Sequence, residues 1–212
     1  MTDDAIAAAY DARAAEYIEI AGSIAQMDPA DRNLIGAWRD RSQGRMLDAG
    51  CGPGLWTEFL HDGHRDVVGV DISSQFLAEA RRRSPHLAFE QATLRDLPFE
   101  DASFGGILAW YSLIHTPPVE LPLIVAELAR VLEPGGSLLI GYFDGRAREQ
   151  FSHAVAPAYF WSADALSELL GDAGFVVTAT ERRTREPGEI SNRPHGALTA
   201  SSAPRNHAGI PA

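Results

Sequence analysis

The chain has 212 residues, the length of one ordinary domain with a single hydrophobic core, so two full domains are not expected. Apolar residues make up 45% of it and charged residues 22%, which excludes global disorder. The 18 Lys and Arg against 29 Asp and Glu give a net charge of -11, which repels a phosphate backbone, so no nucleic-acid partner is expected.

The same composition bears on compartment and metals. The N-terminus lacks the design of a signal peptide, and no apolar stretch approaches the ~18 residues of a membrane helix. The one cysteine, Cys51, excludes an internal disulfide and a multi-cysteine metal site. We therefore expect a cytoplasmic protein with no membrane partner and no metal ion. The sequence does not predict an oligomeric state.

The predicted elements begin with a helix and continue as an alternation of strands and helices. The alanine-rich N-terminus, through Tyr10, Ala14 and Tyr17, is typical of an amphipathic helix that leads into the core. After it, short apolar runs alternate with helix-period segments, the pattern of a parallel sheet covered by helices. Strands are expected at residues 45–47, 66–70, 86–89, 104–110, 137–143 and 175–180, and a short seventh could follow at 196–201.

Capping residues predict where the intervening helices begin. Ser73 is expected to cap one helix. Thr116 before Pro117 predicts another helix start, because the hydroxyl can cap the first turn and proline lacks only an amide hydrogen that would be orphaned there. The apolar face of that helix is expected to run from Leu121 to Leu132.

Together these elements predict an α/β fold: a doubly wound, seven-stranded, mostly parallel sheet with helices on both faces. We expect residues 1–40 to form a helical cap and residues 41–200 the main domain. Residues 201–212 are rich in Ala, Pro, Ser and Asn, which indicates a disordered tail. The segment 143–162 carries no readable motif.

The most informative segment is residues 46–54, where a strand runs straight into glycines and then a helix. Gly50, Gly52 and Gly54 have the spacing G-x-G-x-G. Glycines let the backbone approach a ligand closely and take positive φ angles, and the following helix offers free amide hydrogens. In a doubly wound sheet this turn lies at the carboxyl ends of the strands, where such folds bind ligands. A tight strand-to-helix turn without a ligand remains the alternative.

A carboxylate ends the next strand. Asp71 follows the apolar residues 67–70 directly. Its two oxygens can accept hydrogen bonds from the vicinal hydroxyls of an adenosine ribose, as the acidic residue of nucleotide-binding sheets does. The alternative is that Asp71 only turns the chain or assists the start of the next helix.

Four motifs stand in order along the chain: LDAGCGPG at 47–54, VVGVDIS at 67–73, LPFEDASF at 97–104 and RVLEPGG at 130–136. Together these landmarks resemble the class I S-adenosylmethionine-dependent methyltransferases, especially those that act on small molecules. The resemblance spans roughly residues 10–180 and implies a Rossmann-like fold with a methyltransferase domain at 41–200. It implies S-adenosylmethionine as the cofactor and in-line transfer of its methyl group to a small-molecule acceptor, whose O, N or C nucleophile the sequence does not identify.

The resemblance also implies where the cofactor lies. Asp48, Gly50 and Gly52 would surround its methionine part, and Asp71 would hold the ribose. Tyr17 lies in a segment that looks like the N-terminal helix that covers the cofactor in such enzymes, and its hydroxyl could reach the cofactor's carboxylate. A tyrosine that packs in the core is the alternative.

For the adenine, the resemblance points to the residues before LPF. A backbone amide at Leu94 could donate to the ring, and Ile72 could pack on its flat face. Many relatives carry an acidic residue where Thr93 stands, so adenine recognition is expected to be somewhat weaker here. Gly105 replaces a common, usually structural Asp. The end of the fourth strand, at Ala109, is also expected to contact the cofactor.

No universal catalytic triad is expected, because the positive sulfur already activates the methyl group. The protein supplies orientation and, for an oxygen or nitrogen nucleophile, a group that takes the proton. His115, just after the fourth strand, is the candidate base, and Trp110 or Tyr111 could attract the sulfonium or a flat substrate. The alternative is that His115 packs at a helix start and that the aromatic residues belong to the core.

Two other functions stay open. A non-catalytic S-adenosylmethionine-binding or regulatory protein on the same fold would keep the cofactor and transfer nothing, because methyl transfer leaves no obligatory residue signature. A NAD-dependent oxidoreductase is disfavoured, because the dinucleotide motif G-x-G-x-x-G would place its third glycine at Leu55.

Overall fold

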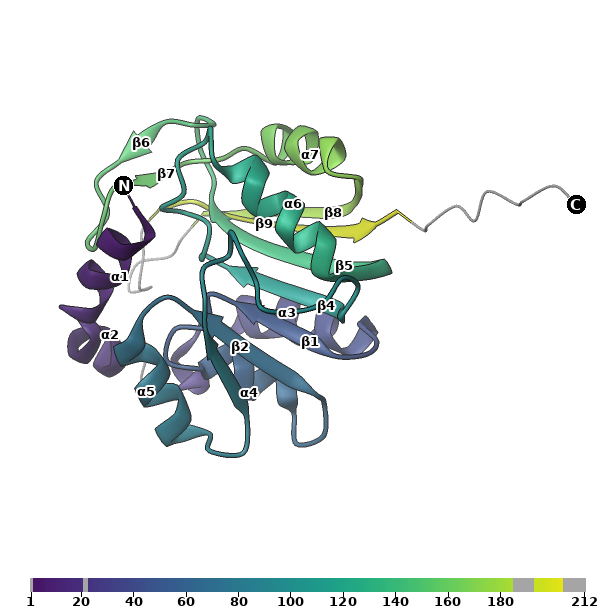
Figure 1. Ribbon diagram of the computed structural model, residues 1–212. Helices are drawn as coiled ribbons and strands as arrows, with labels where there is room; N and C mark the ends of the chain where they lie inside the picture. The colour runs from purple at the N-terminus through teal and green to yellow at the C-terminus, as the bar shows by residue number, and fades with distance from the viewer. Residues whose placement is uncertain (1, 21–22, 185–192, 204–212) are drawn as a thin grey trace, which may run out of the picture.

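The computed structural model describes residues 2–20, 23–184 and 193–203 of the chain. A twisted sheet forms the centre of the molecule, between two layers of helices (Figure 1). The predicted α/β fold with a seven-stranded, mostly parallel sheet is confirmed. The strands are β1 (Met46–Ala49), β2 (Val67–Asp71), β3 (Ala88–Gln91), β4 (Phe104–Trp110), β5 (Leu132–Phe143), β8 (Phe175–Arg183) and β9 (His195–Ser202), and a separate hairpin consists of β6 (Gln150–Phe151) and β7 (Ala158–Tyr159).

The strand order decides which residues meet at the top of the sheet. The order is β3-β2-β1-β4-β5-β9-β8, with parallel pairing from β3 to β5 and antiparallel pairing of β9 with both neighbours. The carboxyl ends of the parallel strands therefore share one edge. Because β9 runs the other way, its first residue, His195, reaches the same edge and pairs there with Phe143 and Arg183.

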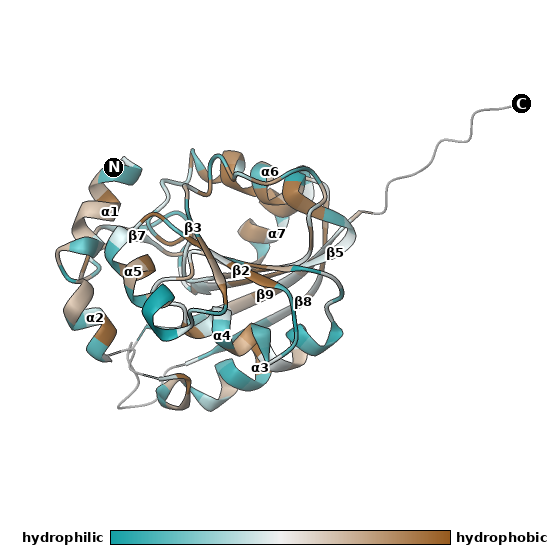
Figure 2. Cartoon of the chain, turned by 60° about the horizontal axis from the view of Figure 1, so that its bottom comes forward, coloured by the Kyte–Doolittle hydropathy of each residue, from teal (hydrophilic) through white to brown (hydrophobic). Residues whose placement is uncertain are grey.

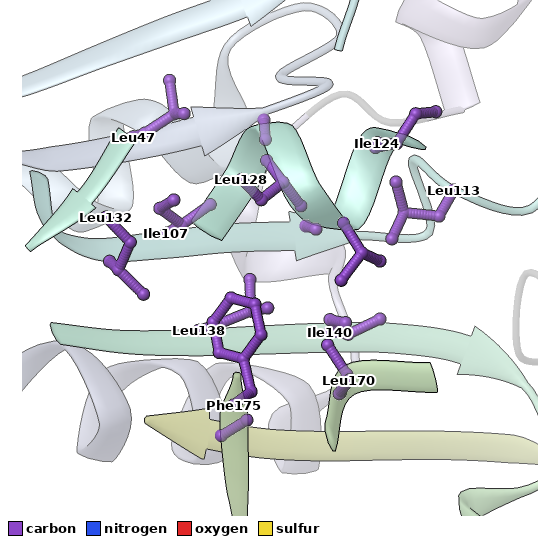
Figure 3. Packing of buried hydrophobic residues seen from close by; sticks show 14 of the residues in the cluster. Leu47, Ile107, Leu113, Ile124, Leu128, Leu132, Leu138, Ile140, Leu170 and Phe175 are labelled. Carbon is purple, nitrogen blue, oxygen red and sulfur yellow. The ribbon is translucent and has the colours of Figure 1, made fainter. Parts of the chain in front are cut away.

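Helices cover both faces of the sheet and bury a continuous apolar core. The larger cluster joins strand residues to two helices on one face (Figure 3), while hydrophobic residues concentrate in the strands and hydrophilic ones on the outer surfaces of the helices (Figure 2). Burial of this apolar surface is the main force that stabilises the fold. The helices are α6 (Leu121–Val131) and α7 (Ala163–Asp172) on one face, and α3 (Pro29–Arg41), α4 (Leu55–His61) and α5 (Ser74–Arg83) on the other.

Two predicted boundaries around α6 are wrong. The helix begins at Leu121, not at Thr116, because the amides of Glu120 and Leu121 both donate to the carbonyl oxygen of Pro117, at 2.8 and 3.2 Å, and so close a separate turn first. At its other end, Leu132 is not part of the helical face. It is the first residue of β5, buried beside β4, and an irregularity in the pairing lies between it and the rest of the strand.

The N-terminal region is several helices where one amphipathic helix was expected. α1 (Asp3–Asp11) and α2 (Ala14–Ile20) pack against α5 at the edge to which the parallel strands point (Figure 1), and a short 3-10 turn, η1 (Ile24–Gln26), follows. α3 instead packs on the sheet through Ile35 and Trp38, which are almost completely buried. α3 therefore belongs to the helical layer on the sheet, and the division of the chain at residue 40 stays a prediction.

Two further outcomes concern the less informative segments. The motif-free stretch 143–162 contains the β6–β7 hairpin. The last strand continues through Ser202, two residues into the expected tail, and residues 204–212 lie outside the described residues. Among the helices of the described part of the chain, none combines the length and apolar character that crossing a membrane requires.

Candidate functional site

A cavity of about 1060 Å³ opens at the carboxyl ends of the parallel strands. Its wall combines the ends of β1, β2 and β4 with α1, α2 and the beginning of α3. Ligand pockets typically measure ~300–1,000 Å³, so this one has room for a nucleotide-sized molecule and a second small one. The predicted site residues on its wall are Tyr17, Gly50, Gly52, Asp71, Ile72, Thr93, Leu94 and His115.

The glycine loop contributes bare backbone to this wall. Gly50 and Gly52 have φ angles of 84° and 51°, which only glycine adopts readily. A Cβ at Gly50 would lie 2.2 Å from Cβ of Ser112, so the loop after β1 and the segment after β4 approach each other too closely for any side chain. A Cβ at Gly52 would meet nothing nearer than 4.0 Å. Gly52 therefore borders open space, as a cradle for a ligand requires.

Asp71 connects the two strand ends. Its Oδ2 accepts a hydrogen bond from the amide of Gly52, and its Oδ1 accepts one from the amide of Ser73, both at 2.8 Å. Burial raises the pKa of the Asp71 carboxyl, and these amides oppose the rise. The alternative, that Asp71 assists the start of α5, is thus present in the structure. It is compatible with ligand binding, because each carboxylate oxygen can accept more than one hydrogen bond.

Two predicted cofactor-binding residues do not line the cavity. Asp48 is buried behind the glycine loop, where the Thr57 hydroxyl donates to its Oδ2 at 2.7 Å and burial raises its pKa to about 7. Ala109 is fully buried in the core cluster beneath α6, because successive residues of β4 face opposite sides of the sheet. Neither residue lines the cavity, and their contact with the cofactor stays a prediction.

The segment before the LPF motif is hydrogen-bonded to a carboxylate of α1. The hydroxyl of Thr93 donates a hydrogen bond to Asp3, a cavity residue. Arg95 holds the same carboxylate at 3.2 Å and also pairs with Glu120 at 2.6 Å. An acidic group that Thr93 itself lacks therefore stands beside it, delivered from residues that are far away in the sequence.

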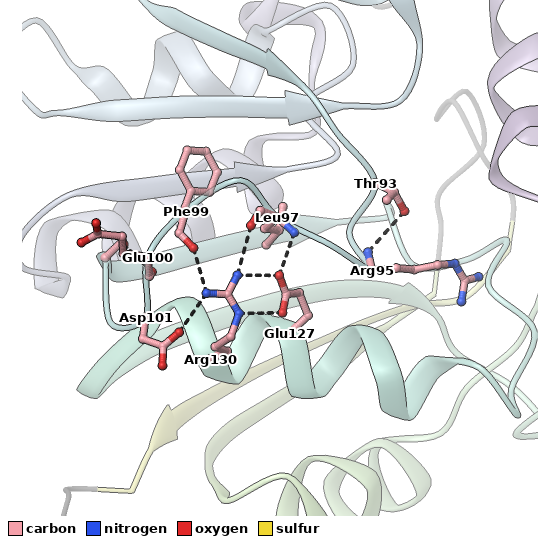
Figure 4. A network of polar contacts seen from close by, with 9 residues as sticks. Thr93, Arg95, Leu97, Phe99, Glu100, Asp101, Glu127 and Arg130 are labelled. Atoms are coloured by element: carbon pink, nitrogen blue, oxygen red, sulfur yellow. Dashed lines mark hydrogen bonds and ion pairs between the residues drawn. The ribbon is translucent and has the colours of Figure 1, made fainter.

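Figure 4 shows how two of the landmarks hold each other in place. Arg130, on α6, donates to the backbone carbonyl oxygens of Phe99 and Leu97 at 2.8 and 3.0 Å. Glu127 binds Arg130 and also accepts from the amide of Leu97 at 2.7 Å. The spacing of LPFEDASF and RVLEPGG thus reflects a structural clamp on the loop between β3 and β4, whose earlier residues line the cavity.

α1 is also fastened near the cavity at its other end. Asp11 accepts hydrogen bonds from the hydroxyl of Ser73 at 2.5 Å and from the amide of Gln75 at 3.2 Å, at the beginning of α5. Tyr10 and Tyr17 form an edge-to-face pair on the wall, with ring centroids 5.9 Å apart. Ser73 was visible in the sequence as a cap, but its partner was not, because nothing local signals a contact across so many residues.

His115 lies on the wall with both ring nitrogens engaged. Its Nδ1 is 2.9 Å from the carbonyl oxygen of Pro157, which can only accept, so Nδ1 carries the hydrogen. Its Nε2 then accepts from the hydroxyl of Tyr10 at 2.8 Å. Burial lowers the pKa of His115. The ring is therefore a neutral partner that fixes Tyr10, and a role as general base stays a prediction.

A second tyrosine–histidine pair was not predicted. Tyr111 lines the cavity with a φ of 58°, a left-handed conformation that costs a residue other than glycine about 1–3 kcal/mol. Its hydroxyl forms a hydrogen bond with Nδ1 of His195, a fully buried residue. Nε2 of His195 lies 4.0 Å from Oδ1 of Asp31, which binds Arg183 at 2.5 Å.

Comparison with known proteins points to one family. The sequence model described as "Methyltransferase domain" matches residues 46–136, which begin at β1 and reach the first part of β5. Malonyl-[acyl-carrier protein] O-methyltransferase of Erwinia billingiae (strain Eb661) is 32% identical over 124 residues, which cover 58% of this chain and 49% of that protein. The chain spans about half or less of the length of the first curated relatives that it matches.

Solved structures share the fold. The 1,6-didemethyltoxoflavin-N1-methyltransferase of Burkholderia thailandensis, with 1,6-didemethyltoxoflavin and S-adenosylhomocysteine bound, has a TM-score of 0.76 at 22% identity and covers 94% of this chain and 88% of its own. The [4+2]-cyclase SpnF has a TM-score of 0.79 at 18% identity and covers 96% and 98%. At such identities the likeness shows the fold alone. Residues 46–136 thus match a methyltransferase domain, and together with the relatives named as methyltransferases and the shared fold they support a class I S-adenosylmethionine-dependent methyltransferase.

Proposed function

We propose that this chain binds S-adenosylmethionine in the cavity and transfers the methyl group to a small-molecule acceptor. The observation that carries this proposal is the meeting of the glycine loop and Asp71 on one wall of a cavity of about 1060 Å³. One end of the cavity then suits an adenosyl group, and the remaining volume suits an acceptor.

The wall residues fit the separate parts of this cofactor. Gly50 and Gly52 would accommodate the methionine end, and the Asp71 carboxylate would accept from the ribose hydroxyls. Tyr17 is placed on the same wall and would reach the carboxylate end of the cofactor.

At the adenine, three residues would act together. Ile72 would cover the ring face and the amide of Leu94 would donate to its edge, since both residues lie on the wall. Asp3, bonded to Thr93, would accept from the exocyclic amine in place of the acidic residue that many relatives carry. The affinity for adenine, expected to be weaker because of Thr93, would then depend on whether α1 keeps Asp3 beside Thr93.

S-Adenosylmethionine, when bound, supplies a methyl group activated by a positively charged sulfur. The task of the protein is to hold the acceptor in line with that group and to remove a proton where the nucleophile carries one. A base role for His115 requires Nε2 to release the Tyr10 hydroxyl first, because that nitrogen is already an acceptor.

Calorimetric titration with S-adenosylmethionine and S-adenosylhomocysteine tests the binding. We expect both to bind, and Asp71→Ala to weaken binding about 10- to 100-fold, as expected from the loss of hydrogen bonds to a charged group. Asp66→Ala is the matched control, because its exposed carboxylate stands just before β2, at the opposite end of that strand from Asp71. Asp71→Asn keeps one acceptor oxygen for the loop amides, which separates ligand loss from loop collapse. Failure of the unchanged protein to bind either compound would overturn the proposal.

Formation of S-adenosylhomocysteine from S-adenosylmethionine with a panel of small acceptors tests the transfer. Binding without product formation across carboxylic acids, phenols and amines would favour the non-catalytic alternative. We further propose that the protein acts in the cytoplasm and has no nucleic-acid partner, which the buried Cys51 thiol and the net charge of -11 support. Fractionation of the cells that produce it checks the compartment.

A further inference from the structure

We propose that Tyr111 takes the proton of the acceptor, and that His195 and Asp31 position Tyr111 and receive the proton from it. This inference rests on the proposed methyl transfer. It assigns a catalytic role to Tyr111, which faces the cavity, and positioning roles to two residues that act through it.

Three elements far apart in the sequence converge behind Tyr111. The tyrosine follows β4, His195 opens β9 and Asp31 lies in the first turn of α3. The imidazole is fully buried, and Asp31 is 6% exposed, although both carry polar atoms that are costly to bury. Arg183, paired with His195 across β8 and β9, binds Asp31 at 2.5 Å and Asp28 at 3.3 Å, and so fixes the carboxylate in place.

The backbone of Tyr111 adopts a strained conformation that sets the direction of its side chain. Its φ of 58° would suit glycine or asparagine better, yet the residue is a tyrosine whose amide donates to the carbonyl oxygen of Gly141 at 3.0 Å. Such outliers persist where the surrounding structure requires them, and they concentrate at functional sites. Here the turn directs a phenol to the cavity and to the buried histidine together.

The surroundings of His195 decide the direction of its hydrogen bond. Oδ1 of Asp31 lies 4.0 Å from Nε2, too far for a hydrogen bond, so its negative charge favours a hydrogen on Nε2 through space alone. Nδ1 is then the ring nitrogen that accepts, and the Tyr111 hydroxyl donates to it. A phenol oxygen that donates in this way can also accept a hydrogen bond, here from the methyl acceptor.

The proton path balances as follows. The acceptor atom uses its lone pair to form the new bond to the methyl carbon, and the electrons of the broken carbon–sulfur bond stay on sulfur. The proton of the acceptor passes to the Tyr111 oxygen as the phenol proton passes to Nδ1 of His195. The positive charge that leaves the sulfonium then resides on the imidazolium, which the Asp31 carboxylate stabilises.

The same relay narrows the class of acceptor. A nucleophile that bears an O–H or N–H needs it, whereas an ionised carboxylate does not. The rings of Trp110 and Phe143 lie 5.6 and 4.9 Å from the Tyr111 ring, and all three line the cavity. These flat apolar surfaces suit a planar acceptor such as a phenol, an enol or a ring nitrogen.

The decisive measurement is the tautomer of His195, read by nitrogen–proton correlation NMR at about pH 8, where an ordinary imidazole is neutral. The spectra are recorded with and without S-adenosylhomocysteine. We expect the hydrogen on Nε2 of His195 and, as an internal control in the same spectrum, on Nδ1 of His115. Tyr111→Phe should shift the Nδ1 resonance of His195 alone, while Tyr10→Phe should shift only the Nε2 resonance of His115.

A hydrogen on Nδ1 of His195, or a resonance that ignores Tyr111→Phe, would overturn the relay even if the cofactor binds. Asp31→Asn provides a second variant, because weaker preference for Nε2–H should follow without loss of the tyrosine. If S-adenosylhomocysteine does not bind but the tautomers are as expected, the proposed function fails and the hydrogen-bond geometry stands. The two failures are therefore distinguishable.

Discussion

Two tyrosine–histidine pairs face one cavity, and they differ in the group behind the histidine. Behind His115 stands the carbonyl oxygen of Pro157, which fixes a hydrogen on the ring and offers no compensating charge. Behind His195 stands the carboxylate of Asp31. A carbonyl favours a neutral ring that holds its tyrosine, whereas a carboxylate favours a ring that can accept a proton. We therefore expect the third group, rather than the pair itself, to determine the chemistry.

The largest expected effect comes from removing one hydroxyl. Tyr111→Phe should lower kcat about 10²- to 10⁴-fold, the usual contribution of general base catalysis, with little change in the affinity for S-adenosylmethionine. Tyr10→Phe removes the corresponding hydroxyl from the other pair and should lower kcat less than about tenfold, since its histidine is a neutral partner. Steady-state kinetics with an acceptor found in the panel measures both. Equal losses in the two variants would erase the distinction between the pairs.

The other pair should matter more for stability. His115→Phe leaves the Tyr10 hydroxyl and the Pro157 carbonyl oxygen without their partner, which should lower the free energy of unfolding by about 1–3 kcal/mol. Urea denaturation measures it. His153→Phe is a suitable control, because the His153 ring is 5.1 Å from His115 and its Nδ1 accepts a long hydrogen bond, at 3.5 Å, from the amide of Val155. A control as destabilising as His115→Phe would mean that packing, not the hydrogen bonds, is responsible.

Removing the charge behind His195 should reduce turnover without removing the tyrosine. Asp31→Asn should lower kcat by about tenfold, the effect of one pKa unit on the imidazolium, and leave KM for the cofactor nearly unchanged. Asp28→Asn is matched to it, because Asp28 also binds Arg183. Comparable kinetics of the two variants would show that Asp31 acts by binding Arg183 and not through its charge near His195.

Asp48 is a further buried group to compare with the two histidines, because it has a hydroxyl partner but no positive charge beside it. Its pKa is raised from 3.8 to about 7, so the folded state binds the proton more tightly than the unfolded state. The stability from this group is present below about pH 4 and is lost as the pH rises to about 7, by at most about 1.4 kcal/mol per pH unit. Asp48→Asn should abolish that part of the dependence in urea denaturation between those pH values. Parallel curves for both proteins would contradict it.

Much of the fold could be predicted because its signals are local. A short run that ends in the glycine loop, or a valine-rich run that ends in Asp71, specifies a strand, its turn and the edge where that turn lies. The start of α6 could not be predicted in the same way, because the turn closed by Pro117 uses the same residues as a helix start. The burial of Asp48 away from the cavity could not be predicted either, because a motif aligns residues without showing which side of the loop each one faces.

The acceptor side of the cavity is harder to predict for a physical reason. His195 meets Tyr111 only because β9 pairs antiparallel with β5, and a different register would place another residue there. Asp31 arrives with α3, whose position depends on the burial of Ile35 and Trp38. The positive φ of Tyr111 could not be predicted, because the residue is neither glycine nor asparagine, the types that usually adopt it. Each contact depends on the complete tertiary structure.

The direction of β9 has a practical consequence for handling the protein. The strand leads away from His195 for eight residues, so Ser202 emerges about 25 Å from the mouth of the cavity. A tether to a solid support, or a fused reporter, attached after Ser202 would leave access to the cavity free. The same attachment ahead of α1 would disturb Asp3 and Tyr10, whose contacts with Thr93 and His115 hold α1 on the wall of the cavity.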